Sequence, residues 1–174
     1  KRQVSSKLNT GVTKITSSYG AFAALKTDGS VVTWGDRNTG SDSSAVASKL
    51  SSGVTHISSN SAAFAALKSD GSVVTWGEVG DINAVTNQLR SGVLQVFSTQ
   101  NAFAALKSDG SVVTWGGGSG GDSSAVASKL SGGVVAFANP FTDDRLTFTA
   151  VSGVISYNTV WEGEVYINGS IKII

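Results

Sequence analysis

One segment of this chain is present in three copies, and this repetition constrains the fold more than any other feature. The sequence AFAALKTDGSVVTWG of residues 21–35 recurs almost unchanged at residues 63–77 and 102–116. A period of about 40 residues is typical of proteins built from stacked or ring-arranged copies of one supersecondary unit. One copy cannot bury its apolar face alone, so each copy is expected to pack on its neighbours.

The repeats extend beyond this segment, because similar apolar and glycine positions precede each copy and follow the last one. Three full units are therefore predicted, with a partial copy at each end. The units lie near residues 11–50, 53–89 and 92–130. We expect residues 1–137 to form the repeat region and residues 138–174 to hold a divergent fourth repeat and a β-rich tail. The chain has no methionine, even at position 1, and is expected to be a piece of a longer translation product.

Within each unit the hydrophobic pattern is that of β structure. In the second unit, residues 53–59 alternate apolar and polar side chains, residues 64–67 are a continuous apolar run, and residues 72–76 follow. Such runs predict three strands per unit. The Asp-Gly pair between the last two runs, as at Asp70-Gly71, predicts a tight hairpin turn.

The segment from Ser43 to Leu50, which follows the first Trp-Gly and a polar loop, is compatible with a short helix or a fourth edge strand. Ser43 as an N-cap, Val46 and Leu50 four residues apart, and Gly53 beyond the end favour one or two helical turns.

Composition excludes several classes of protein. The 174 residues are 40% hydrophobic but only 14% charged, whereas roughly 25% charged residues are usual. A net charge of +1 without a basic stripe argues against nucleic acid or an anionic membrane as a partner. The lack of cysteine excludes disulfides, thiol catalysis and cysteine metal sites. No segment is apolar over the length needed to cross a bilayer.

The repeated pattern Gly-Val-x-x-Ile-Ser-Ser, then Ala-x-Ala-Leu-Lys-x-Asp-Gly-x-Val-x-x-Trp-Gly, resembles the blade repeat of the regulator of chromosome condensation family. It is most similar to the shorter bacterial versions, such as the propeller-type β-lactamase inhibitory protein. The resemblance covers roughly residues 4–137 and implies an all-β fold of tandem propeller-like blades. Repeats of the WD type differ because they end in Trp-Asp.

Two departures from the family pattern bear on function. Family blades often carry a histidine before the Ala-Leu strand, where this chain has Tyr19, Ser61 and Asn101. Family rings usually close with seven blades, and the repeats here are too few for such a ring. An open arrangement would leave sheet edges exposed.

The last residues predict further β structure. Residues 133–157 resemble a worn fourth copy with Tyr157 in the place of the Trp. Residues 159–174 are predicted to form two strands around Asn168-Gly169, and they resemble the start of some secreted parallel β-helix domains. Asn168-Gly-Ser170 also fits a glycan acceptor sequence, although a hairpin turn is the simpler interpretation.

Large apolar side chains that recur at fixed repeat positions are predicted to form the structural core. Recurring tryptophans could be an aromatic ligand platform, but packing between blades is the favoured interpretation. The predicted core residues are Phe22, Leu25, Trp34, Phe64, Leu67, Trp76, Phe103, Leu106 and Trp115.

No catalytic set is found in the sequence, so we expect no enzyme and no cofactor. His56 is the one histidine, and its counterparts in the other units are Lys14 and Gln95, which favours a solvated strand-face residue over a general base. Residues 117–121 match the nucleophile-elbow pattern, but only because the loop is rich in glycine.

Three acidic residues, Asp42, Asp81 and Asp122, lie in similar loops and could contribute to a Ca²⁺ site. One carboxylate per loop is too few for such a site. A helix cap or turn is the favoured role, and no metal site is predicted.

Self-association is the favoured function. The incomplete repeats at both ends and an apolar last strand indicate that sheets are completed by other copies, giving an extracellular fibre or surface layer. The predicted contacts are two terminal strands, Val4 to Ile15 and Glu164 to Ile174. Their self-association residues are Val4, Leu8, Val12, Ile15, Val165, Ile167, Ile171, Ile173 and Ile174.

The alternative function is a scaffold that binds another surface protein through loops that differ between copies. These loops are residues 36–41, 78–83 and 117–121. A closed binding propeller needs more blades than this chain supplies, which favours assembly. Guanine-nucleotide exchange, known for the namesake of the family, is not expected, since no matching basic patch is present.

Overall fold

The computed structural model of the protein describes residues 2–80 and 82–135. The chain divides into two compact units, residues 1–137 and 138–174. The second unit lies outside the described residues, and so do Asp81, the expected hairpin of the fourth repeat, the tail strands and Asn168. The predicted contact residues Val165, Ile167, Ile171, Ile173 and Ile174 lie outside them as well.

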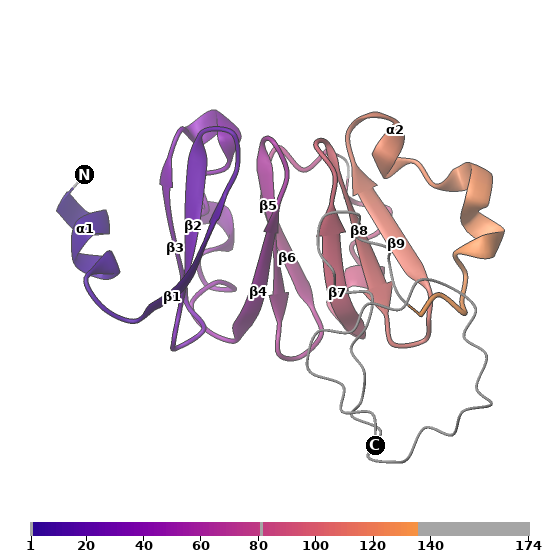
Figure 1. The fold of residues 1–174 in the computed structure, drawn as a ribbon, viewed down its shortest axis with the longest axis horizontal. Coiled ribbons are helices and arrows are strands. Elements are labelled where there is room, and N and C mark those ends of the chain that lie inside the picture. The colour runs from indigo at the N-terminus through magenta and orange to yellow at the C-terminus, as the bar shows by residue number, and fades with distance from the viewer. Residues whose placement is uncertain (1, 81, 136–174) are drawn as a thin grey trace, which may run out of the picture. The chain divides into compact units, whose positions relative to one another are not determined.

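The described residues contain three antiparallel sheets of three strands each, which confirms the all-β, tandem-repeat blade fold (Figure 1). In every sheet the strands lie in chain order, with the second strand in the middle. Blade 1 consists of β1 (Val12–Ser17), β2 (Ala21–Lys26) and β3 (Val31–Gly35). Blade 2 consists of β4 (Val54–Ser59), β5 (Ala63–Lys68) and β6 (Val73–Gly77). Blade 3 consists of β7 (Val93–Ser98), β8 (Ala102–Lys107) and β9 (Val112–Gly116).

The hairpin between the second and third strands is built as its Asp-Gly pair predicts. In blade 2, Gly71 has a φ of 75°, which glycine adopts without strain. Its N–H donates to the carbonyl of Lys68 at 3.0 Å. The Asp70 carboxylate accepts the backbone N–H and the hydroxyl of Ser72, at 3.0 and 2.6 Å. The same turn recurs in the other two blades, so all three hairpins share one register.

Short helices precede blade 1, occupy the connections between the blades and follow blade 3. They are α1 (Arg2–Leu8), η1 (Arg37–Thr39), η2 (Ser44–Val46), η3 (Gln88–Arg90), α2 (Gly118–Gly121) and η4 (Ser124–Lys129), where η marks a 3₁₀ helix. The helical interpretation of residues 43–50 is therefore correct. The prediction of a strand from Val4 to Ile15 is wrong in its first half, because Val4 and Leu8 lie in α1. Val4 and Leu8 occupy the repeat positions of Val46 and Leu50, and both segments form helical turns, as an α-helix in the first and as a 3₁₀ helix followed by turns in the second.

Ser43 does not cap η2 with its side chain, contrary to the prediction. Its hydroxyl instead lies 3.0 Å from the Thr33 hydroxyl. The neighbouring Asp42 takes over the role, because its carboxylate accepts the backbone N–H of Ser44 at 3.1 Å. Asp122 does the same for Ser124 at 2.9 Å. The favoured interpretation of both aspartates as cap or turn residues is confirmed.

The blades pack face to face, and the hydrophobic core lies between them. One buried cluster joins one face of blade 1 to a face of blade 2, and it includes Leu25, Phe64 and Trp76. The second joins blade 2 to blade 3 and includes Leu67 and Trp115. The core is thus divided between interfaces and does not lie inside any single sheet.

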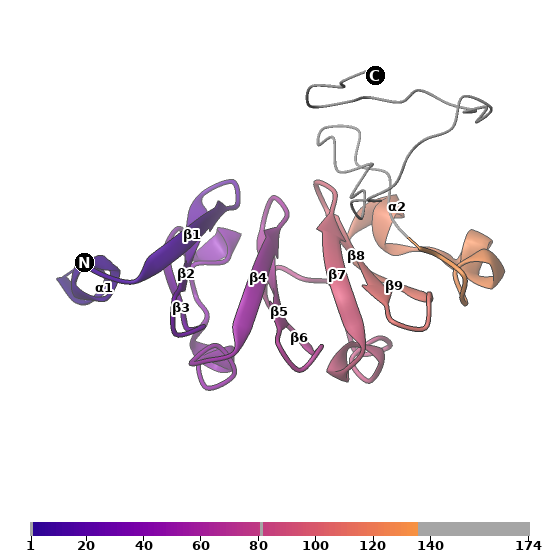
Figure 2. The ribbon, with the colours of Figure 1, turned by 60° about the horizontal axis from the view of Figure 1, so that its bottom comes forward.

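Hydrogen bonds connect neighbouring blades along their first strands, which lie side by side in both ribbon views (Figures 1 and 2). The Thr16 hydroxyl donates to the carbonyl of Ile57 at 3.3 Å, and the Ser58 hydroxyl donates to the carbonyl of Val96 at 2.8 Å. At the hairpin end, the N–H of Val54 donates to the carbonyl of Gly29 at 3.0 Å. The interface between blades is therefore specified by both apolar packing and directional bonds.

Candidate interaction surface

The two faces of each blade differ in side-chain size. Neighbouring residues of a strand point to opposite faces, so the AFAAL sequence of the central strand places two alanines and a leucine on one face and a phenylalanine on the other. In blade 1 the Phe22 ring stacks on Trp34 with 5.3 Å between ring centroids. Blades 2 and 3 repeat this stack with Phe64–Trp76 and Phe103–Trp115. Each interface joins an aromatic face to the small-residue face of the preceding blade.

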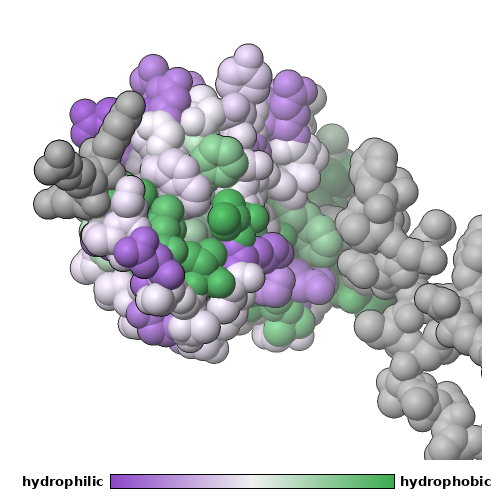
Figure 3. All heavy atoms as spheres, turned by 60° about the vertical axis from the view of Figure 1, so that its left-hand side comes forward, coloured by the Kyte–Doolittle hydropathy of each residue, from purple (hydrophilic) through white to green (hydrophobic). Residues whose placement is uncertain are grey.

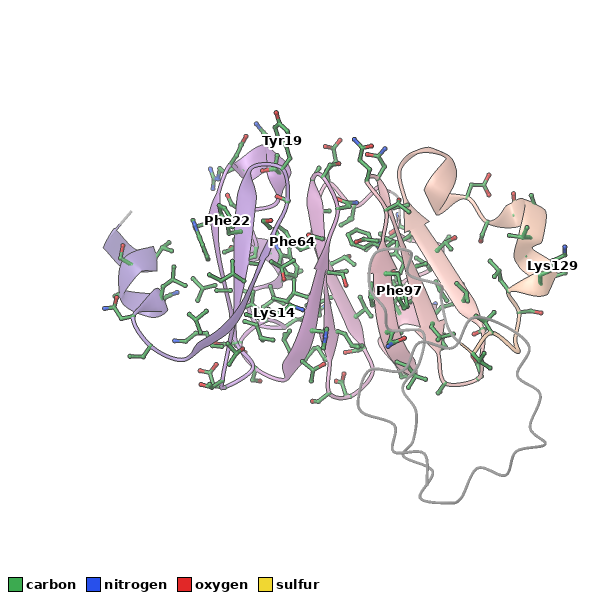
Figure 4. All side chains as sticks on the ribbon, viewed as in Figure 1. Lys14, Tyr19, Phe22, Phe64, Phe97 and Lys129 are labelled. Atoms are coloured by element: carbon green, nitrogen blue, oxygen red, sulfur yellow. The ribbon has the colours of Figure 1, made fainter. Side chains whose placement is uncertain are left out.

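The aromatic face of blade 1 differs from the other two because no blade among the described residues covers it. Phe64 and Phe103 are 0% and 1% exposed, whereas Phe22 is 42% exposed. Ile15, on the same face, is 55% exposed, while its counterpart Ile57 is buried. In Figure 4, Phe22 lies on the side of blade 1 toward α1, and Phe64 lies between blades 1 and 2.

We define the outer face of blade 1 by Ile15, Phe22, Val32 and Trp34, which share one side of the sheet. Figure 3 shows an apolar patch on this side of the molecule, with polar residues around it. Helix α1 packs beside β3 and leaves Phe22 accessible. Large aromatic and aliphatic side chains on an exposed face are typical of protein contact surfaces.

Seven of the nine predicted core residues are buried, and six of the seven lie in these interfaces: Leu25, Phe64, Leu67, Trp76, Phe103 and Trp115. Phe22 is the exception that corrects the prediction, because it is exposed, and Trp34 is only half-buried. Repeat identity fixed the chemical character of both positions, but their burial depends on whether a preceding blade is present. Sequence reasoning therefore assigned to the core two residues that belong to the accessible surface.

A second, polar surface lies at the loop end of the blades. A pocket of about 340 Å³ is lined there by residues of blades 2 and 3 and their loops, including Asn60, Ser61, Glu78 and Asn101. The loops that differ between copies contribute to its wall through Glu78 and Gly117. Tyr19, at the equivalent turn of blade 1, is 90% exposed. Figure 4 shows this tyrosine at the loop end of blade 1.

The side chains considered for catalysis or metal binding do not form a site. His56 is exposed on β4, as Lys14 and Gln95 are at the equivalent positions of β1 and β7. Within residues 2–80 and 82–135, no group of three acidic, histidine or cysteine residues could hold a metal ion. The same ranges contain no helix of the length and apolarity that a membrane span requires. A four-residue helix, α2, stands where a glycine loop was expected.

The loop carboxylates have electrostatic roles within their turns. Hydrogen bonds from Ser44 and the nearby Arg37 guanidinium hold the pKa of Asp42 below its usual value. Arg37 and Asp42 form an exposed ion pair at 3.1 Å. Exposed pairs of this kind contribute little to stability. Asp42 is therefore a turn-forming residue.

The fold defines a tandem-repeat protein with propeller-type blades. No family model matches the chain, and no curated protein matches it in sequence. Among solved structures, the ectodomain of the Arabidopsis thaliana receptor kinase ACR4 is similar with a TM-score of 0.47 and 21% identity, over 63% of this chain and 38% of that chain. Human WBSCR16 is similar with a TM-score of 0.43 and 17% identity, over 60% and 34%. Yeast RCC1 (Prp20), in its complex with Kap60, has a TM-score of 0.42 and 16% identity, over 60% and 29%. The matched part is about a third of the length of these structures.

Proposed function

We propose that the protein is a repeat scaffold that self-associates, and that the outer face of blade 1 is the contact between two copies. The observation that carries the proposal is the exposure of Phe22 at a position whose counterparts, Phe64 and Phe103, are completely covered. Full burial of an exposed phenylalanine releases about 1.5–3 kcal/mol, and covering the 42% of Phe22 that is exposed releases roughly half of that amount. A second blade-like surface is the partner that suits a sheet face of this shape and chemistry.

The partner surface is the same face of a second copy, related by a two-fold axis. A head-to-tail contact would need an accessible face of alanines and leucine, but in blade 3 both Ala102 and Leu106 are already buried. An isologous contact uses only residues that are accessible in each copy, namely Ile15, Phe22 and Trp34. Two-fold contacts of this kind are also the commonest in oligomers of identical chains.

The dimer is proposed as the building unit of an extracellular structural assembly, either a fibre or a surface layer. Support for this wider role comes from the sequence, where a charged fraction of 14% and many serine and threonine residues suit close packing of copies. Measuring the protein in surface and secreted fractions of its source cells, with an antibody to the full chain, tests the location.

Light scattering of the full chain after size-exclusion chromatography tests the contact. We expect a mass of twice 17.7 kDa for the natural chain and a monomer for Phe22→Lys. Leu94→Lys is the matched control, because Leu94 is 57% exposed on β7 and lies outside the outer face of blade 1. A dimer that persists in Phe22→Lys, or a natural chain that is monomeric, would overturn the proposal.

A second candidate function is recognition of another protein through the loop end. The observation that favours it is the polar pocket between blades 2 and 3, whose wall includes loops that differ from copy to copy. A monomeric natural chain that captures a surface protein from its own source, and loses it on Glu78→Lys but not on Leu94→Lys, would favour recognition over self-association.

A further inference from the structure

The third strand of each blade is an edge strand with backbone groups directed away from its sheet. Propeller blades generally have four strands, whereas the described blades have three. After β3 and β9 the chain forms helical turns in place of a fourth strand (Figure 1). The outer edges of β3 and β9 therefore lack a strand partner among the described residues.

The register of the hairpin identifies the outward groups. The N–H of Lys26 donates to the carbonyl of Ser30 at 2.9 Å, so this is a hydrogen-bonded pair of the β2–β3 hairpin. Hydrogen-bonded and non-hydrogen-bonded pairs alternate in an antiparallel ladder. Val31 and Thr33 belong to non-hydrogen-bonded pairs, and their backbone groups point to the outer edge. The N–H of Val31 confirms this direction, since it donates outward to the carbonyl of Leu50 at 2.9 Å.

Blade 3 has the same geometry. The N–H of Val112 donates outward to the carbonyl of Leu130 at 2.9 Å, so the backbone of Thr114 also points to the outer edge. The side chains of Thr33 and Thr114 are already engaged, because their hydroxyls donate to the carbonyls of Ser41 and Gly121 at 2.7 and 2.9 Å. Across residues 2–80 and 82–135, no hydrogen bond reaches the backbone N–H of either threonine.

A groove runs along each of these two edges. The groove at β3 has a volume of about 530 Å³, and its lining includes Val4 and Lys7 of α1 and Ala47 and Leu50 of the segment after η2. The groove at β9 has a volume of about 410 Å³ and is lined by the same repeat positions of the third unit. Its corresponding residues are Val85, Gln88, Ala127 and Leu130. Because the two grooves lie at equivalent repeat positions, the groove is a property of the repeat unit.

We propose that the groove at β3 receives an extended segment that adds to the blade as its fourth strand, and that this segment is residues 164–167 of a second copy, the strand that is predicted before the Asn168-Gly169 turn. Strand addition uses the outward N–H and carbonyl groups of an edge, and pockets beside the edge take alternate side chains. In residues 164–167, Val165 and Ile167 alternate with polar or amphipathic residues, as a strand with one apolar side requires.

Charge favours the groove at β3 over the one at β9. Lys7, Lys26 and Asp28 line the groove at β3, so two lysines and one aspartate leave its lining with one net positive charge, whereas the residues that line the groove at β9 are uncharged. Glu164, at the start of the segment, supplies a carboxylate for these lysines. The inference rests on the proposed self-association, but it uses a surface that does not include Phe22.

Amide hydrogen exchange of the full chain, followed by NMR, tests the inference residue by residue. The Val31 and Val112 amides are internal references, because they are hydrogen-bonded within the chain. We expect the Thr33 amide to exchange at least roughly tenfold more slowly than an open edge amide, since an added strand would accept its N–H. Protection should increase with protein concentration, because the segment comes from a second copy. Fast exchange at Thr33, or protection independent of concentration, would overturn the inference.

A proline substitution within the segment tests whether the segment itself causes the protection of Thr33. Ile167→Pro removes an N–H and the extended conformation of a paired strand, whereas Ile167→Val retains both. We expect Thr33 protection to be lost in the first variant and kept in the second. A synthetic peptide of residues 164–174 should restore protection to Ile167→Pro, and failure of both effects would contradict strand addition.

The variant Phe22→Lys distinguishes this inference from the proposed contact at blade 1. If Phe22→Lys is monomeric at low concentration yet gains Thr33 protection from the peptide, the groove binds as inferred and the blade contact is also supported. If Phe22→Lys leaves the dimer intact but the peptide still protects Thr33, only the blade contact is wrong. Absence of peptide protection in every variant contradicts the groove alone.

Discussion

The indole N–H of Trp76 donates a 2.9 Å hydrogen bond to the backbone carbonyl of Gly40, which joins blade 2 to the loop that precedes it. Trp115 occupies the same position in blade 3 and is also buried, but its indole N–H has no partner among the described residues. Loop length explains the difference. The positions from Trp34 to Leu50 differ by 16, whereas those from Trp76 to Leu89 differ by 13, so the second loop is three residues shorter.

The two tryptophans are therefore expected to differ in their response to the same substitution. Trp76→Phe leaves the buried carbonyl of Gly40 without its donor, which costs about 1–3 kcal/mol beyond the loss of ring volume. Trp115→Phe loses a similar volume and removes a donor that was already unsatisfied. Urea unfolding of both variants measures the difference, and equal losses of unfolding free energy would contradict it.

The three phenylalanines of the central strands provide a second comparison. Phe64→Ala opens a cavity in the interface between blades 1 and 2, and we expect a loss of about 3–5 kcal/mol in unfolding free energy. Phe22→Ala removes a ring that is 42% exposed, so its cost should be clearly smaller. Chemical denaturation at protein concentrations low enough to keep the chains monomeric measures both. Similar losses for the two variants would mean that Phe22 is covered in solution.

Much of the fold could be predicted from the sequence because local chemistry decides it. The alternation of residues 53–59 and the Asp70-Gly71 turn predict the strands of blade 2 and their register, as the structure has them. The helix at Val4 and Leu8 could also have been found, since these residues match Val46 and Leu50, for which a helical turn was predicted. The prediction of a strand at Val4 and Leu8 was wrong because these residues were interpreted as a terminal sheet edge and were not compared with their repeat counterparts.

The candidate surface could not be predicted in the same way. Phe22 and Phe64 have identical sequence neighbours, and only the presence of a preceding blade decides which of them is exposed. The helix cap was likewise predicted at Ser43, whereas Asp42 provides it. The Ser43 hydroxyl pairs with the hydroxyl of Thr33, which lies on a strand ten residues away. Contacts between elements, which a local pattern does not contain, determine these features.

Gly29 is expected to be the least replaceable residue of its hairpin. Its φ of 74° is unfavourable for other residues, and an added Cβ would lie 2.6 Å from the backbone nitrogen of Gly53 in the next unit. Gly133 is a matched control, because it has a φ of 78° but no atom of the described residues lies within 4 Å of such a Cβ. We expect Gly29→Ala to lower the melting temperature well beyond the effect of Gly133→Ala, which reflects only a backbone cost of about 1–2 kcal/mol. Equal effects in calorimetry would show that the blades can shift apart without cost.

The hairpin aspartates should make the stability of the protein depend on pH in the acid range. Hydrogen bonds from the hydroxyl and then the backbone N–H of Ser72 lower the pKa of Asp70, and Asp28 and Asp109 are lowered in the same way by Ser30 and Ser111. A carboxyl whose pKa is lower in the folded state binds protons more readily when unfolded. Its contribution is therefore present above the unfolded value of about 3.9 and is lost as the pH falls through the folded pKa.

We expect the melting temperature of the natural chain to fall as the pH drops below about 4. Asp70→Asn should give a shallower fall, because the amide oxygen still accepts the N–H of Ser72 but does not titrate. A variant with all three hairpin aspartates replaced by asparagine should be shallower still, since the turns are equivalent and lie in separate blades. Calorimetry from pH 2 to pH 7 on the three proteins measures these slopes. If the melting temperatures of the three proteins fall in parallel, protonation of the hairpin aspartates does not destabilise the fold. The loss of stability at acid pH would then have another cause.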